Sequence, residues 1–316
     1  MLKIYASDAA GQLQLQPEIT HNNLIYMVAP SLEEIHMLSQ RLAIPEAYLS
    51  DALDHNPRPH MEKSPHAQLM VLNAPQLINE HAILNQAMYQ ICAVGIIHTE
   101  NHLVIVSSQA LAVMDDVIEA KYGHFHSHMK TRMSLLIFKA IADSYNQHLT
   151  QMNKKIADYQ QRLKKSYRNQ ELFGLMGINK SLVNFSTSLA AMNIVYQRLM
   201  QGVDVKIHPL EQKLLKDIWE EMRQAAEITE MRRESLSNLM DAYAAIVHNN
   251  LNAVLKMLTT LAIVMVIPTM IGSIFSMNVA LPYEDSGITT IVVSACMLIT
   301  IVVLLYVFYK KNYLRV

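Results

Sequence analysis

The sequence predicts an α+β membrane protein: an N-terminal α/β domain, then a long helical stalk, then two C-terminal transmembrane helices. Three observations lead to this fold class. Apolar residues make up 51% of the 316 residues and charged residues only 17%, below the roughly one quarter usual in soluble domains. Between Met257 and Tyr309 the only charged residues are Glu284 and Asp285. Before and partly within that region, two long runs contain neither glycine nor proline.

Residues 1–122 read as the α/β domain, because short β-rich runs alternate with capped helical patterns. Ser31, followed three residues later by Glu34, is a capping-box signature that opens a helix. A second helix is expected to start near Pro45. The expected strands are 24–29, 67–72, 91–97 and 102–107. This part is therefore predicted to be a sheet with helices beside it.

The runs without glycine or proline, 124–173 and 210–267, predict very long helices. At 1.5 Å per residue the second run spans roughly 85 Å, which exceeds a compact domain. Its apolar residues recur every three or four positions from Leu210 to Ile246, so it needs a packing partner along its length. The region 123–201 is predicted to be a helical hairpin, with its turn at Gly174–Gly177 and a returning helix over 178–199. Residues 208–253 are the expected stalk helix.

Two segments are long and apolar enough to span a hydrocarbon core near 30 Å. The predicted division is a first transmembrane helix at 254–277, an outer loop at 278–286, a second transmembrane helix at 287–309 and a basic tail at 310–316. Positive charge lies on the side opposite the acidic loop, at Lys256, Lys310, Lys311 and Arg315. The positive-inside rule then places both termini in the cytosol, in agreement with an N-terminus that lacks a signal-peptide pattern.

The first span carries a polar stripe on one face. Steps of three and four from Asn252 reach Thr259, Thr269, Ser273 and Ser276, and a polar stripe on a membrane helix faces protein or water. Small and hydroxyl residues also serve plain helix packing, and two apolar helices can simply anchor a soluble domain. If the stripe lines a pore, one chain cannot enclose it and a cyclic homo-oligomer follows. The candidate pore-lining residues are Asn252, Leu255, Leu258, Thr259, Ala262, Val266, Thr269 and Ser273.

Several function classes lack support in the sequence. Formal net charge is −1 and no long basic block occurs, so a nucleic-acid partner is not expected. Cys92 and Cys296 lie far apart, and no disulfide framework is implied. A glycine-rich phosphate loop, a nucleophile elbow and a His-Glu-x-x-His helix are absent from the sequence, so we do not expect an enzyme.

Histidines alternate at His124, His126 and His128. In a strand the three imidazoles would lie on one side and could bind zinc, whereas a helix would bring only His124 and His128 together. Fourteen histidines in the chain also make a chance cluster easy.

The residues around the first span resemble those of the CorA magnesium transporters. The resemblance lies in Ile267-Pro268-Thr269-Met270-Ile271, in Phe275-Ser276-Met277-Asn278 and in Leu281-Pro282; upstream, Asp51-Ala-Leu-Asp54 with Pro57-Arg58-Pro59 is similar to a segment of the family's cytosolic domain. It implies a homopentamer in a lipid bilayer, in a prokaryotic inner or plasma membrane, that passes Mg²⁺ and also Co²⁺ or Ni²⁺. Ser276, Met277 and Asn278 would form the selectivity signature, with one Asn278 amide per protomer in a ring around the hydrated ion.

The resemblance has further implications. Glu284 and Asp285 would concentrate cations at the mouth, and Asp217 falls where relatives carry an acidic residue of an intracellular regulatory cation site that favours the closed state. The usual signature is Tyr-Gly-Met-Asn, so Phe275 and Ser276 depart from it. Two alternatives therefore stay open: a ZntB-like transporter of Zn²⁺ or another divalent cation, and a membrane-anchored cation sensor that does not conduct.

Overall fold

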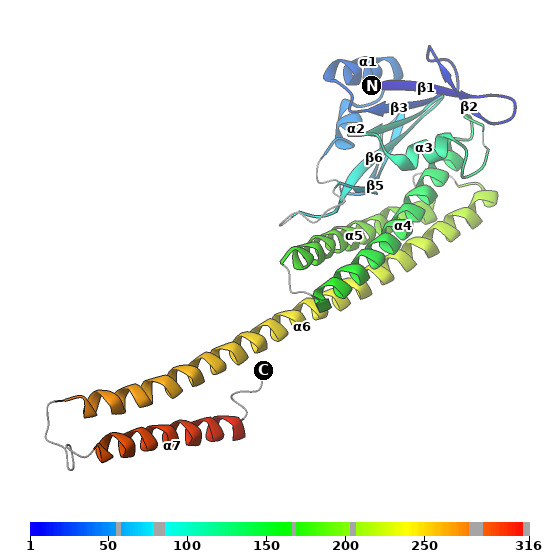
Figure 1. The fold of residues 1–316 in the computed structure, drawn as a ribbon. Helices are drawn as coiled ribbons and strands as arrows, with labels where there is room; N and C mark the ends of the chain where they lie inside the picture. The colour runs from blue at the N-terminus through cyan, green and yellow to red at the C-terminus, as the bar shows by residue number, and fades with distance from the viewer. Residues whose placement is uncertain are drawn as a thin grey trace. The chain divides into compact units, whose positions relative to one another are not determined.

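The structure is a computed structural model that describes residues 1–311 except 55–57, 79–85, 125, 166–168, 203–206 and 278–286. It divides into two compact units, Met1–Ser237 and Asn238–Val316. The first unit holds a sheet and its covering helices, and the second holds two long apolar helical segments (Figure 1).

A seven-stranded sheet forms the centre of the first unit. Its strand order is β2-β1-β3-β7-β6-β5-β4, and every neighbouring pair is antiparallel except β3 and β7. The strands are β1 (Leu2–Ser7), β2 (Leu13–Gln16), β3 (Leu24–Val28), β4 (His60–Lys63), β5 (Ala67–Leu77), β6 (Tyr89–Thr99) and β7 (Leu103–Ser107). The four expected strands correspond to β3, β5, β6 and β7, and the sequence did not reveal β1, β2 or β4.

One face of the sheet is covered by α1 (Leu32–Leu42) and α2 (Glu46–Asp51). Apolar residues of both helices pack on every second residue of the strands, such as Leu69 and Val71. Together they form one buried apolar cluster. The predicted capping box opens α1: the Glu34 N–H donates to Ser31 Oγ at 3.2 Å, and the Ser31 N–H donates to the Glu34 carboxylate at 2.9 Å. These bonds satisfy backbone donors that a helix start leaves unpaired.

The other face carries α3 (Ala112–Ile118), α4 (Lys130–Lys165) and α5 (Asn169–Gln201). Buried polar side chains fix the helical hairpin on the strands. Tyr145 of α4 is fully buried, and its hydroxyl donates to the Asn73 carbonyl of β5 at 3.2 Å. Ser181 of α5 accepts the backbone N–H groups of Met88 and Tyr89 at 3.0 and 3.1 Å.

The prediction of a hairpin turn at Gly174–Gly177 is wrong, because α5 begins at Asn169 and runs through both glycines. They permit close packing instead. A Cβ on Gly174 would lie 2.5 Å from the Tyr159 ring, and a Cβ on Gly177 would lie 2.9 Å from the backbone oxygen of Gln86. The returning helix is therefore longer than the predicted 178–199, and the first helix starts at Lys130, six residues after His124.

The long helix α6 (Pro209–Phe275) belongs to the first unit up to Ser237. There it packs against the hairpin and buries the predicted stripe, including Ile218, Met222 and Ala225. Ion pairs link it to α4, from Arg132 to Glu211 at 3.0 Å and from Lys139 to Glu221 at 3.2 Å. The first stripe residue, Leu210, is 80% exposed, so burial begins further along the helix than the pattern indicated.

We expect the first unit to lose stability in acid because of His98. Its ring is buried, with Nε2 2.7 Å from Ser134 Oγ, and burial, with Lys130 nearby, lowers its pKa from 6.5 to about 4. The folded protein keeps the ring neutral while the unfolded chain protonates it, so the free energy of unfolding should fall by about 3 kcal/mol as pH drops from 6.5 to 4.

Thermal unfolding of the full chain in detergent measures this effect. The melting temperature of the native protein should fall more steeply with decreasing pH than that of His98→Gln. His66→Gln is the control for the loss of an exposed histidine; an unchanged slope in His98→Gln would contradict this assignment.

Candidate ion pathway

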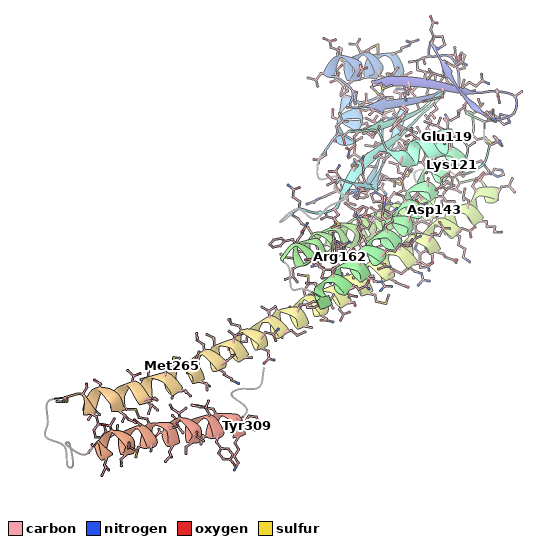
Figure 2. The ribbon with its side chains drawn as sticks, in the orientation of Figure 1. Glu119, Lys121, Asp143, Arg162, Met265 and Tyr309 are labelled. Atoms are coloured by element: carbon pink, nitrogen blue, oxygen red, sulfur yellow. The ribbon has the colours of Figure 1, made fainter. Side chains whose placement is uncertain are left out.

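The second unit contains both segments that are long and apolar enough to cross a membrane, the end of α6 and α7 (Ile288–Lys310). Their exposed apolar side chains include Met265 at 65%, and Tyr309 near the end of α7 is 61% exposed (Figure 2). An exposed apolar surface of this extent requires lipid or further protein chains around it. Tyr309 beside Lys310 has the composition of a membrane–water interface.

The helix α7 covers one side of the end of α6 (Figure 1). Thr260 on that side is only 1% exposed, whereas most residues of this segment are open. Gly272 lies against α7, since a Cβ there would lie 3.3 Å from Met297 Cε of α7. The less exposed positions, Ile263, Val264, Ile267, Pro268, Ile271 and Gly272, follow the same side.

The predicted pore-lining residues lie on the opposite side of α6. At about 100° per residue, their positions centre roughly half a turn from the side that α7 covers. All of them are exposed within the chain: Asn252, Leu255, Leu258, Thr259, Ala262, Val266, Thr269 and Ser273. The stripe is therefore available to other copies of the chain or to water.

The stripe hydroxyls point oxygen lone pairs outward. Thr259 donates its hydroxyl hydrogen to the Leu255 carbonyl and Thr269 to the Met265 carbonyl, each at 2.8 Å. A hydroxyl that has given its hydrogen to its own helix can only accept from the other side. Rows of such acceptors suit water bound to a cation, because hydration water donates.

The signature begins where α6 ends. Ser276 continues the last turn, with its N–H donating to the Gly272 carbonyl at 3.0 Å and its hydroxyl to the Ser273 carbonyl at 2.9 Å. Ser276 is not one of the non-glycine residues with a left-handed backbone in the described part of the chain. Serine therefore fits here without backbone strain. Met277 is 62% exposed. Asn278, Glu284 and Asp285 lie outside the described residues.

The candidate sites predicted to be cytosolic occupy separate places in the first unit. Asp217 is on an exposed side of α6. His124, His126 and His128 precede α4 in a segment without strand or helix in its described residues, where the His126 and His128 rings stack with centroids 5.4 Å apart. Among the described residues, one group of three metal-ligating side chains has its ligand atoms within 4.8 Å of one another. That group does not include His124, His126 or His128.

Sequence reasoning missed an acidic pair between α4 and α6. Burial, and then the Asp143 carboxyl group, raise the pKa of Glu221. Glu221 Oε1 pairs with Lys139, and Glu221 Oε2 is buried in a carboxyl group that interacts with Asp143. The sequence signal was weak, since each residue alone reads as an ordinary charge on a long helix.

Residues 24–311 match the family described as CorA-like Mg²⁺ transporter protein. The chain belongs to this family. A curated relative, the cobalt/magnesium transport protein CorA of Methanocaldococcus jannaschii, is 22% identical over 90% of this chain and 89% of its own length. The CorA of Thermotoga maritima is 23% identical over 58% of this chain and 54% of its length.

Solved structures agree on the CorA fold. The complete CorA magnesium transporter of M. jannaschii superposes with a TM-score of 0.84 at 20% identity and covers 99% of this chain and 98% of its own. Full-length CmaX gives 0.69 at 12% identity over 96% and 97%. The ZntB cytoplasmic domain of Vibrio parahaemolyticus gives 0.60 at 11% identity over 78% and 97%. The predicted family and fold class are confirmed.

Proposed function

We propose that this CorA-family chain forms a channel for hydrated divalent cations, with Mg²⁺ as the main ion and Co²⁺ or Ni²⁺ as further ones. The observation that carries the proposal is the exposed stripe of α6, which faces away from α7 and presents hydroxyl oxygens as acceptors. The family match and the cobalt/magnesium transport relatives support it.

The channel is a homopentamer in this proposal. Five copies of α6 place their stripes around one axis, and α7 forms an outer layer toward lipid. Asn278, directly after Met277, contributes one amide oxygen per protomer to a ring at the mouth. Mg²⁺ loses its water reluctantly, so a ring of amides at outer-sphere distance suits the hydrated ion.

The order of side chains along the stripe suggests a mechanism of conduction. Leu255, Leu258 and Val266 form apolar constrictions that close by dewetting, and Thr259 and Thr269 provide polar stops between them. Glu284 and Asp285 raise the cation concentration outside. Both termini and Asp217 face the cytosol, where a bound cation at Asp217 favours the closed state.

A zinc transporter is the second candidate, because the ZntB cytoplasmic domain shares the fold of the first unit. The two functions differ in ion and in coupling. A passive Mg²⁺ channel is driven by about 2.3 kcal/mol per charge per 100 mV of membrane potential, and a proton-coupled zinc transporter responds to a pH gradient.

The native protein should admit Mg²⁺ into proteoliposomes at a rate set by the membrane potential. Purified protein is reconstituted with Mg²⁺- and Zn²⁺-sensitive dyes inside, and entry of each ion, and of Co²⁺ through its quenching of a dye, is measured at fixed potential with and without a pH gradient. Protein-free liposomes give the leak. Zinc entry that requires the pH gradient would replace the channel by the ZntB-like function, and entry of no ion would favour a non-conducting sensor.

A further inference from the structure

A group of three metal-ligating side chains lies in the first unit, far in sequence from the α6 stripe. Asp51 ends α2, and His60 and Glu62 belong to β4. One ligand atom from each lies within 4.8 Å of the other two. His60 Nε2 is 3.7 Å from Asp51 Oδ2 and 3.9 Å from Glu62 Oε1.

The fold brings these residues together for simple reasons. His60 and Glu62 are two positions apart in a strand, so their side chains share a face. That face is the one covered by α2, because their strand partners Val71 and Leu69 belong to the core cluster beneath α1 and α2. Met61 between them points to the other face and is buried.

The end of α2 is seated tightly on the sheet. Ala52, next to Asp51, packs on Gly95 of β6, where an added Cβ would lie only 2.6 Å from the Ala52 Cβ. On the other face, Arg198 of α5 donates to the Met61 carbonyl at 2.7 Å and holds β4 in place. The core thus sets the backbone positions of the three ligand residues.

The tautomer of His60 is fixed for metal binding. Its Nδ1 lies 2.8 Å from the Arg58 carbonyl oxygen, which can only accept, so Nδ1 carries a hydrogen. In the neutral ring Nε2 then presents a lone pair toward the two carboxylates. A backbone carbonyl that orients a histidine in this way is the usual outer support of a metal-bound imidazole.

We propose that Asp51, His60 and Glu62 bind a transition-metal dication of the Zn²⁺, Co²⁺ or Ni²⁺ class. Zn–N and Zn–O bonds near 2.1 Å in a tetrahedron put ligand atoms about 3.4 Å apart. The two distances from His60 Nε2, 3.7 and 3.9 Å, lie close to this value, and all three ligand atoms, which lie within 4.8 Å of one another, would move closer together on binding. The side chains are 41, 34 and 53% exposed, which leaves room for water as the fourth ligand. Imidazole nitrogen suits these metals, whereas Mg²⁺ prefers oxygen alone.

This site does not depend on the proposed transport, and its test measures binding without flux. Full-length protein in detergent is stripped with a chelator, loaded with Zn²⁺ alone and gel-filtered, and the zinc retained per chain is measured in millimolar Mg²⁺. Native protein should retain one Zn²⁺ more per chain than His60→Gln and Asp51→Asn. Co²⁺ in place of Zn²⁺ should give visible absorption bands that the same variants lose.

Two further variants make the result specific. His66→Gln changes a nearby exposed histidine and should keep the native zinc content. His60→Lys places an ammonium between the carboxylates, which offsets part of their negative charge in place of a metal ion, and an ammonium cannot ligate zinc. Equal zinc retention in native protein and in folded His60→Lys would overturn the site, as would displacement of the zinc by Mg²⁺ at equal concentration.

Discussion

Ala262→Trp is expected to reduce Mg²⁺ flux in proteoliposomes at least about tenfold, because the substitution narrows the pathway at its smallest side chain. Ala262 lies in the middle of the exposed stripe of α6, between Thr259 and Val266. In a pentamer each substitution is repeated five times around one axis. Five indoles would replace five methyl groups at one level, which fills the space that a hydrated ion needs.

The matched control is Leu261→Trp. Leu261 is also exposed, at 51%, but it points about 100° away around the helix axis. In the proposed assembly Leu261 faces lipid or a neighbouring helix. The Mg²⁺ flux of Leu261→Trp should therefore stay within about twofold of native. Both variants must elute as the native oligomer. Equal flux in Ala262→Trp and native protein would exclude the stripe as the ion pathway.

The polar stripe could be predicted from the sequence because it differs from the rest of its helix. Its hydroxyl and amide residues recur on one face, and the structure leaves that face open. The side of α7 that meets α6 could not be predicted, since α7 is apolar all round and shows no preferred face. The packing of Met297 on Gly272, with Val293 beside the same part of α6, reveals it.

Glycines misled the prediction of the helical hairpin for a physical reason. A glycine in a long helical pattern indicates either an end or a close contact, and the sequence does not distinguish the two. Gly174 and Gly177 serve contacts with Tyr159 and Gln86. Knowledge of those partners requires the tertiary fold.

The short edge strand β4 was also missed, and with it the Asp51–His60–Glu62 site. Four residues that follow Pro57-Arg58-Pro59 give too short a pattern for a strand to be recognised. Asp51 and His60 are nine positions apart, with no metal-binding spacing to connect them. Their proximity depends on α2 lying over the face of β4, which follows from the core packing.

Asn278→Ala is expected to remove Mg²⁺ entry almost completely. The argument rests on chemistry and position: α6 ends at Phe275, Ser276 and Met277 complete its last turn, and Asn278 is the next residue, at the mouth of the proposed pore. Alanine removes the amide oxygen that accepts from the ion's water. The remaining stripe could still pass water, but the first site for the hydrated ion would be lost, and Mg²⁺ would compete poorly with bulk solvent.

Ser276→Gly is the matched control for that experiment, because it restores the usual residue of the signature two positions away. The backbone of Ser276 is not left-handed, so glycine would relieve no strain at this position. We expect Ser276→Gly to leave Mg²⁺ entry within about twofold of native. Entry is measured with an internal dye at fixed membrane potential, after both variants are shown to assemble equally. Full Mg²⁺ entry in Asn278→Ala would remove the amide ring from the mechanism. A large gain in Ser276→Gly would instead show that the serine itself restricts the native channel.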